Sequence, residues 1–520
     1  MKTQTVRTLR RLSQALFLIL FLFLFIQTES KGSDELGYPV RIFLDFDPLI
    51  ALATLLSAHT LVAGFMFSLI LIVLTVFLGR VFCGWICPLG TLHDAVGFFN
   101  RRRSLPAHHG WYRVKYAILF FLLASSFVTA QLAGIIDPIS LLIRSLSLSV
   151  YPLFNYGARA FFDTLYALDI PVITDGSEWI YDLLKRSVLS FQQPYFLQGT
   201  FIGVLFAFIV GMNLFEKRFW CRYLCPLGAL LGIFSRHALL TRSVSEGCTS
   251  CGVCRKICPS GAVVDREGRW RGSECLYCMD CEDLCPEGAI RFGWRKGGES
   301  LPIDLSRRHV FASLIAGVSV VPLLRIAPQP REGWFHPTLI RPPGAVEEGE
   351  FLRRCVRCGE CMKVCITNGL QPTLFEAGLE GIWTPRLVPK IGYCEFRCTL
   401  CGQVCPTGAI TELTVPEKER TKIGLAVIDT ERCLPYAYNI PCSVCEEMCP
   451  TPEKAIWLEE VNIQSVEKGD VILKRPKVDV ERCVGCGICE ARCPVRSRPA
   501  IYVISTNESR SDGNRFLISP

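Results

Sequence analysis

The sequence predicts an α-helical membrane domain of four helices with an internal duplication, a fifth membrane segment, and two α+β domains organised by groups of cysteines. Three observations predict this fold class: long apolar segments, a motif that occurs twice, and 28 cysteines that fall in tight, regular groups within 520 residues. Disulfide frameworks are typical of small secreted domains with little core. Since this chain is long and 50% hydrophobic, metal ligation is the favoured use of its cysteines.

Four apolar segments approach the roughly 20 residues that a membrane-spanning helix needs. They place a membrane domain over residues 1–240. The first segment follows a basic N-terminus, as a signal peptide does, but no small-residue cleavage site is evident after it. The segments are residues 12–27, 61–79, 116–136 and about 196–215.

The charges that flank these segments predict their orientation. Basic loops of membrane proteins stay in the cytoplasm, so the N-terminus and the end of the fourth segment are expected there. The loop between the second and third segments is basic, with Arg80, Arg101, Arg102, Arg103, Arg113 and Lys115. The longer loop between the third and fourth segments is acidic, with Asp163, Asp169, Asp175, Glu178 and Asp182.

The repeated motif contains four cysteines. Residues 80–90 (RVFCGWICPLG) are echoed by residues 218–228 (RFWCRYLCPLG), each after an outside-to-inside helix. Two related halves packed about a pseudo-twofold axis would bring these thiols together, where they could ligate a metal or cluster or form a redox pair. The alternative is that each turn only shapes a helix end. The cofactor stays open for Cys83, Cys87, Cys221 and Cys225.

A weaker echo lies on the outer side, where Asp47-Pro48-Leu49 resembles Asp137-Pro138-Ile139. These aspartates could line a quinone pocket and accept a proton. Asp and Pro are also common in the turns that enter helices, and this second interpretation is favoured.

Residues 241–298 contain two runs with the C-x2-C-x2-C-x3-C-P spacing of bacterial two-cluster ferredoxins. In that pattern three close cysteines hold one [4Fe–4S] cluster and the fourth reaches the sister cluster. Zinc sites usually use pairs of cysteines, so zinc is disfavoured. Short strands are expected at residues 261–264 and 288–290. One predicted ligand set is Cys248, Cys251, Cys254 and Cys285, and the other is Cys275, Cys278, Cys281 and Cys258.

Residues 299–350 are predicted to cross the membrane and form a linker. Ser306-Arg307-Arg308 precedes an apolar run over residues 310–324 and is similar to a twin-arginine export signal. The alternative is a buried or re-entrant helix. A Pro-rich stretch from Pro328 to Pro343 then marks a domain boundary.

Residues 351–520 hold four more runs, and three of them end in Cys-Pro. We predict a four-cluster domain in which the first run pairs with the fourth and the second with the third. The ligands are Cys355, Cys358, Cys361 and Cys365; Cys394, Cys398, Cys401 and Cys405; Cys433, Cys442, Cys445 and Cys449; and Cys483, Cys486, Cys489 and Cys493.

The cysteine count and the charge agree with about six clusters. Six runs of four use 24 cysteines, and the repeated turns use the remaining four. The net charge of +8 shows no basic stripe with interleaved aromatics, so nucleic acid is not an expected partner. The sequence has no Ser-His-Asp or HExxH arrangement, CxxCH haem site, GxGxxG loop or P-loop.

On these motifs, residues 1–298 resemble the NapH family of quinol-dehydrogenase membrane components. Residues 300–520, with the Ser-Arg-Arg signal and four runs, resemble the NapG-type exported ferredoxins. The resemblance implies a natural fusion that takes electrons from quinol and passes them to a periplasmic reductase. Two features depart from the families: the fusion itself, and Ile366 in place of the usual proline.

The sequence therefore predicts an iron–sulfur electron-transfer protein of the cytoplasmic membrane. It would connect the quinone pool or a cytoplasmic ferredoxin with an exported reductase or electron carrier, as the electron-transfer part of a quinol dehydrogenase. Residues 241–298 would be cytoplasmic and residues 351–520 periplasmic. An assembly or reactivation factor that reduces a partner's metal centre is the alternative function. A polyferredoxin facing only the cytoplasm is expected if residues 310–324 do not span.

Overall fold

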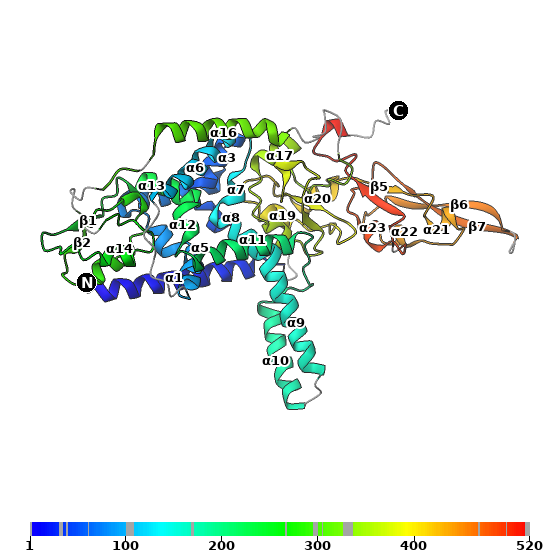
Figure 1. The fold of residues 1–520 in the computed structure, drawn as a ribbon. Helices are drawn as coiled ribbons and strands as arrows, with labels where there is room; N and C mark the ends of the chain where they lie inside the picture. Colours follow the sequence, from blue (N-terminus) through cyan, green and yellow to red (C-terminus); the bar gives the residue numbers. More distant parts are fainter. Residues whose placement is uncertain are drawn as a thin grey trace. The chain divides into compact units, whose positions relative to one another are not determined.

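The computed structural model describes most of the chain (Figure 1). The chain forms two compact units. The first unit combines Met1–Gln27, Pro39–Leu146 and Thr200–Leu323, and the second combines Thr28–Tyr38, Ser147–Gly199 and Leu324–Pro520. The predicted basic residues 101–103 and linker residues 328–335 lie outside the described ranges. These ranges are 3–30, 35–37, 40–60, 62–99, 109–167, 171–265, 268–294, 300–303, 305–325, 336–465, 469–495 and 497–514.

Each of the five predicted apolar segments contains a helix. Two helices are long and apolar enough to cross a membrane, at Val6–Gln27 and Arg307–Arg325, while Ala63–Leu78 and Gly199–Leu214 are apolar but shorter. Their apolar composition, free of Pro and acidic residues at most positions, favours this helical conformation. The helices are α1 (Thr3–Gln27), α4 (Phe67–Leu78), α6 (Tyr112–Phe127), α11 (Gly199–Gly211) and α16 (Arg307–Arg325).

The prediction of one continuous segment over residues 116–136 is wrong. Helix α6 ends at Phe127, and Thr129 has a left-handed backbone with a φ of 69°. The chain then turns inward, where the Gln131 side chain donates to Thr54 Oγ1 at 3.0 Å, before the short helix α7 (Ala133–Ile136). Hydropathy does not report such a turn, because residues 128–132 are nearly as apolar as the helix before them.

Four helices of the first unit begin with the same local chemistry. Asp47 and Asp137 accept N–H groups at the starts of α3 (Pro48–Ala58) and α8 (Pro138–Ser145). Cysteine sulfurs do the same at α5 (Pro88–Gly97) and α13 (Pro226–Ser235). In each case proline occupies the first helical position, where its missing N–H costs nothing. Short helices α2 (Ile42–Asp45) and α12 (Phe219–Tyr223) complete this part.

The first ferredoxin-like segment also belongs to the first unit. Its first strand, β1 (Thr241–Val244), pairs antiparallel with its last strand, β2 (Ile290–Gly293), and encloses α14 (Val253–Ile257) and α15 (Asp280–Asp283). The expected strand after Cys285 is thus present in part. The expected strand at 261–264 is reduced to one bridge, between Val263 and Trp270.

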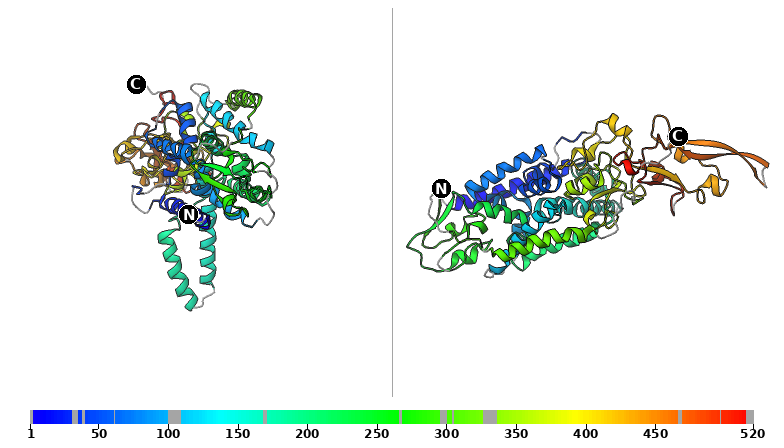
Figure 2. Two further views of the ribbon diagram at one scale, coloured as in Figure 1. Left: turned by 90° about the vertical axis from the view of Figure 1, so that its left-hand side faces the viewer. Right: turned by 90° about the horizontal axis from the view of Figure 1, so that it is seen from above.

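The second unit contains a helical hairpin and the other cysteine runs. Helices α9 (Tyr151–Ala167) and α10 (Pro171–Ser187) lie side by side and antiparallel (Figures 1 and 2). The remaining helices are short: α17 (Glu348–Arg354), α18 (Glu360–Lys363), α19 (Leu400–Gln403), α20 (Val415–Arg420), α21 (Leu434–Ala437), α22 (Val444–Glu447) and α23 (Ile488–Arg492). The strands are β3 (Leu370–Pro372), β4 (Pro385–Leu387), β5 (Leu425–Ile428), β6 (Ile456–Ser465), β7 (Gly469–Val478) and β8 (Ile501–Ile504).

At three places along the chain an antiparallel pairing joins the segment before one cysteine run to the segment after the next, and we call each such pairing a strand frame. In the first ferredoxin, β1 before the first run pairs with β2 after the second. In the second unit β5 and β8 enclose the third and fourth runs in the same way, and an antiparallel bridge between Ala345 and Ile410 encloses the first and second. Each frame therefore holds two consecutive cysteine runs.

Candidate metal centres

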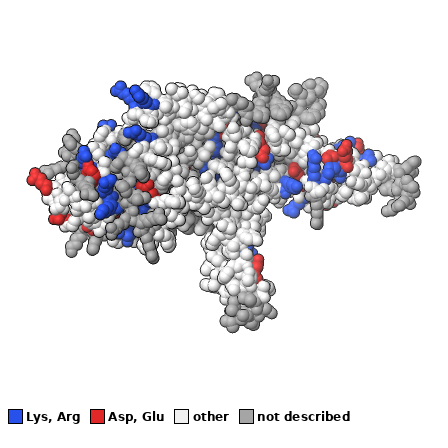
Figure 3. All heavy atoms as spheres, viewed as in Figure 1, with Lys and Arg blue, Asp and Glu red and all other residues white. Residues whose placement is uncertain are grey.

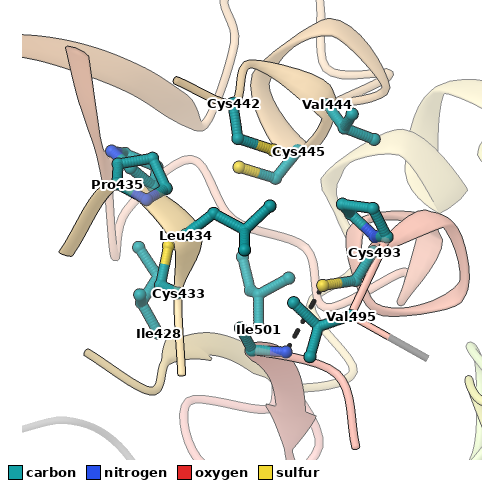
Figure 4. Close-up of a pocket in the computed structure, with 13 residues that line it drawn as sticks. Ile428, Cys433, Leu434, Pro435, Cys442, Val444, Cys445, Cys493, Val495 and Ile501 are labelled. Atoms are coloured by element: carbon teal, nitrogen blue, oxygen red, sulfur yellow. Dashed lines mark hydrogen bonds between the residues drawn. The ribbon is translucent and has the colours of Figure 1, made fainter. Parts of the chain in front are cut away.

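One cavity of the second unit is lined by four cysteines from two runs. Cys433, Cys442 and Cys445 come from the third run and Cys493 from the end of the fourth, and Figure 4 shows their sulfurs around a common space. The backbone N–H of Ala500 donates to Cys493 Sγ at 3.3 Å. Three thiols from one run and one from its neighbour is the arrangement that a two-cluster ferredoxin uses.

Two further cavities repeat this arrangement. The first is lined by Cys394, Cys398 and Cys401 of the second run and by the last cysteine of the first run, Cys365. The second is lined by Cys483, Cys486 and Cys489 of the fourth run and by the last cysteine of the third run, Cys449.

The fourth group of cysteines in the second unit is identified by electrostatic interactions between its thiols. Burial raises the pKa of the Cys358 thiol, and nearby Cys405 and Cys355 raise it further. Burial and the thiols Cys358, Cys355 and Cys405 do the same for Cys361. Cys355, Cys358 and Cys361 of the first run thus lie near Cys405, the last cysteine of the second run.

These four groups correct the predicted pairing. The first run shares its groups with the second and the third with the fourth, so the prediction of first with fourth and second with third is wrong. The physical reason is the antiparallel pairing, because the strands β5 and β8 close around the third and fourth runs and the Ala345–Ile410 bridge closes around the first and second.

In the first ferredoxin the structure brings thiols of each predicted ligand set near one another. Burial, then Cys281 and Cys258, raise the pKa of the Cys275 thiol, and Cys258 also lies near Cys278 and Cys281. On the other side, Cys254 interacts with Cys248 and Cys251. That Cys285 completes this second set stays a prediction.

The surroundings of the thiols suit an anionic cluster. Backbone N–H groups donate to cysteine sulfurs, as Tyr277 does to Cys275 at 3.4 Å and Ile410 to Cys405 at 3.4 Å. Buried Arg242 lies beside thiols of both groups in the first ferredoxin. Donors and cations of this kind stabilise the negative charge of a cluster held by thiolates. Among the residues that the structure describes, no three Cys, His, Asp or Glu side chains are close enough to share a single metal ion.

Lys418 should tune the potential of one centre. It is buried, donates to the Phe396 carbonyl at 3.3 Å and interacts with Cys394 and Cys401. Because a cation favours the more negative, reduced form of a cluster, Lys418→Met is expected to lower that centre's reduction potential by tens of millivolts. A redox titration followed by electron paramagnetic resonance measures the shift. Lys474→Met, an exposed cation on β7, is the control, and equal potentials in both variants would contradict the assignment.

The structure brings the repeated-turn cysteines together. Burial raises the pKa of Cys221, which interacts with Cys83, and both interact with Cys87 and Cys225. The outer aspartates act as helix caps, as the favoured interpretation predicted: Asp47 Oδ1 accepts the Leu49 N–H at 2.8 Å. Asp137 caps α8 in the same manner. A quinone pocket at these aspartates stays a prediction.

Repeated, strand-framed groups of four thiols define the class of multi-cluster ferredoxins. Two family models agree: one described as a 4Fe-4S binding domain matches residues 60–106, 198–243 and 400–416, and one described as a 4Fe-4S dicluster domain matches residues 440–497. The protein therefore binds several [4Fe–4S] clusters and serves electron transfer.

Relatives give the particular family. The chain is 38% identical over 169 residues to the methylamine utilization ferredoxin-type protein MauM of Methylorubrum extorquens, covering 32% of this chain and 72% of that protein. It is 35% identical over 176 residues to the ferredoxin-type protein NapG of Escherichia coli K12, covering 33% and 73%. MauM of Methylobacillus flagellatus is 34% identical over 199 residues, covering 38% and 79%. The chain belongs to this NapG/MauM family of ferredoxin-type proteins. No solved structure matches it.

Proposed function

We propose that this protein is a membrane-bound conduit that carries electrons from the quinone pool, or from a cytoplasmic ferredoxin, to an exported reductase or electron carrier. Six [4Fe–4S] clusters would be held by the 24 cysteines of the six runs, and each would supply reversible one-electron transfer. The proposal rests on which chain segments form the second unit. This unit contains both the four-cluster segment and loops that are expected outside the membrane.

Two groups of hydrogen bonds connect the four-cluster segment to these loops. Lys363 Nζ donates to the Thr28 carbonyl at 2.7 Å, directly after α1. Gln371 accepts the Leu197 N–H at 3.1 Å and donates to the Tyr195 carbonyl at 3.0 Å, directly before α11. If the basic N-terminus is cytoplasmic, the end of α1 and the start of α11 both lie on the outer side. The cysteine runs bound to them would lie there too.

The surfaces of the apolar helices support several membrane crossings. Helices α4, α11 and α16 expose rows of large apolar side chains, among them Ile70, Val73, Phe201, Val204, Phe208, Phe311 and Ile315. Figure 3 shows charged residues gathered at the ferredoxin end of the first unit and a largely uncharged surface over its helices. Apolar patches of this extent mark protein or membrane contacts. Arg307 and Arg308 stand at the start of α16, as a twin-arginine signal requires.

Quinol oxidation tests the donor. Purified full-length protein in lipid vesicles, given a quinol analogue, is expected to reduce an artificial acceptor, with bleaching of the cluster absorbance under quinol alone. Clusters that are intact but never reduced by quinol would contradict the quinol link and favour the assembly or reactivation role.

The side of the four-cluster segment is tested separately. Alkaline phosphatase fused after residue 350 is expected to be active, because that enzyme matures only outside the cytoplasm. A fusion after residue 294, at the end of the first ferredoxin, is the control and should be inactive. An inactive fusion after residue 350 would exclude the exported placement and leave a polyferredoxin that faces the cytoplasm.

A further inference from the structure

The two repeated turns meet in one buried site of the first unit. Cys87 and Cys225 cap the ten-residue helices α5 and α13, and their sulfurs accept the Gly90 and Gly228 N–H groups at 3.4 and 3.2 Å. Cys83 and Cys221 lie within electrostatic reach of both. The positive ends of two helices are therefore directed at four converging thiols.

The arginine that precedes each turn contacts the other turn. Arg80 precedes the first turn, but its side chain reaches the second turn. A Cβ added to Gly228 would lie 2.6 Å from Arg80 Nη2. Arg218 precedes the second turn and donates to the Cys83 carbonyl of the first at 2.9 Å. Both guanidinium groups are buried, and Arg80 Nε has no hydrogen-bond partner among the described residues. Each half thus supplies a cation to the thiols of the other.

The fixed charges beside these thiols do not cancel. Arg80 and Lys115 are both buried and share a single carboxylate, Glu274. Asp94 balances Arg218. Two buried cations that share one carboxylate leave positive charge in excess, which an anion held by the four thiols would neutralise. This favours a site that carries negative charge when it is filled.

Both turns also contact the backbone of one ferredoxin centre. A Cβ on Gly84 would lie 2.3 Å from the Leu276 carbonyl, and Trp85 Nε1 donates to the Tyr277 carbonyl at 3.0 Å. These two carbonyls lie between Cys275 and Cys278. From the second turn, Arg222 donates to the carbonyls of Pro259 at 2.9 Å and Cys258 at 3.3 Å.

All four contacted positions belong to the segments that carry the ligand set Cys258, Cys275, Cys278 and Cys281. The first turn makes its contacts from a π-helix, Phe82–Ile86, a conformation that is frequent at functional sites. A packing motif would need neither four converging thiols nor contacts from both turns to the same centre.

We propose that Cys83, Cys87, Cys221 and Cys225 hold a further iron–sulfur cluster, in addition to the six of the ferredoxin runs. Its position suits the exchange of single electrons with the Cys258/Cys275/Cys278/Cys281 centre, where one cluster is oxidised as the other is reduced. The proposal requires neither quinol oxidation nor export of the second unit, so it can fail or hold independently of the proposed function.

The test compares iron and acid-labile sulfide in anaerobically purified full-length protein and in the double variant Cys87→Ser/Cys225→Ser. Serine is a preferred N-cap, so both helices should still begin normally. Six cubanes account for about 24 irons. The wild type is expected to exceed that number by two to four irons with equal sulfide, and the variant should lose only this excess together with one paramagnetic signal.

Thr91→Ala on α5 is the matched control and should keep the full iron content. Retention of about 24 irons in the double variant shows that it has folded. Three results would overturn the proposal: equal iron in wild type and variant, a single zinc ion lost in place of iron and sulfide, or a disulfide among these cysteines in the anaerobic protein.

Discussion

Removal of iron from the anaerobic protein is expected to unfold the cysteine-rich part of the second unit, residues 336–514. Most of its regular elements are short: α18, α19, α21 and α22 have four residues each and β3 and β4 have three, and only the hairpin strands β6 and β7 reach ten. Structural metal sites contribute about 10–16 kcal/mol to small domains, which is as large as the total stability of about 5–15 kcal/mol of an ordinary domain. Clusters at the four cysteine groups would thus supply most of the folding energy.

Limited proteolysis with and without an iron chelator, under reducing conditions, measures this effect. Cleavage should begin throughout residues 336–514 as the cluster absorbance is lost. The helices α3 and α4 of the first unit are the internal control, because they pack on each other and on α13 and their helical signal should persist. A protease pattern that is unchanged after complete removal of iron would contradict a structural role for the clusters.

The cysteine runs were predictable because three thiolates that hold one cubane need short, fixed spacings. The pairing of the runs was not, because every run carries the same triad and only tertiary structure selects its partner. Eight residues separate Cys433 from Cys442 in the third run. They contain α21, whose Tyr436 hydroxyl donates to the Pro476 carbonyl of β7 at 3.0 Å. The α21 insertion thus packs on a second insertion, the β6–β7 hairpin. Neither insertion affects which runs pair.

The repeated turns show the opposite case. The echo between residues 80–90 and 218–228 predicted that Cys83, Cys87, Cys221 and Cys225 converge, and the structure brings them together. The cations around them escaped the sequence analysis, which used Arg80 and Lys115 only as topology signals. Whether a basic residue faces water or a buried carboxylate depends on packing, and a linear pattern of charge carries no information about that.

Glu274→Ala is expected to destabilise the first unit strongly, because Glu274 is the carboxylate on which the first ferredoxin meets the helices. Its buried side chain forms ion pairs with Lys115 and with Arg80, the latter at 3.4 Å, and accepts the Tyr116 hydroxyl at 2.9 Å. Removing one partner of a buried ion pair leaves the other charge uncompensated, at a cost of about 3–5 kcal/mol. Here two cations would be left.

Thermal unfolding of the anaerobic protein, followed by loss of cluster absorbance, should therefore show a large drop in midpoint for Glu274→Ala. Glu287→Ala is the matched control, since Glu287 is exposed in the same ferredoxin and should change stability by no more than about 0.5 kcal/mol. Glu274→Gln should fall between the two, because an amide can still accept from Tyr116 and Lys115 but carries no charge. If all three variants melted with the wild type, the ion pairs of Glu274 would not be what joins the ferredoxin to the helices, and other contacts, such as those of Trp85 and Arg222, would have to hold it.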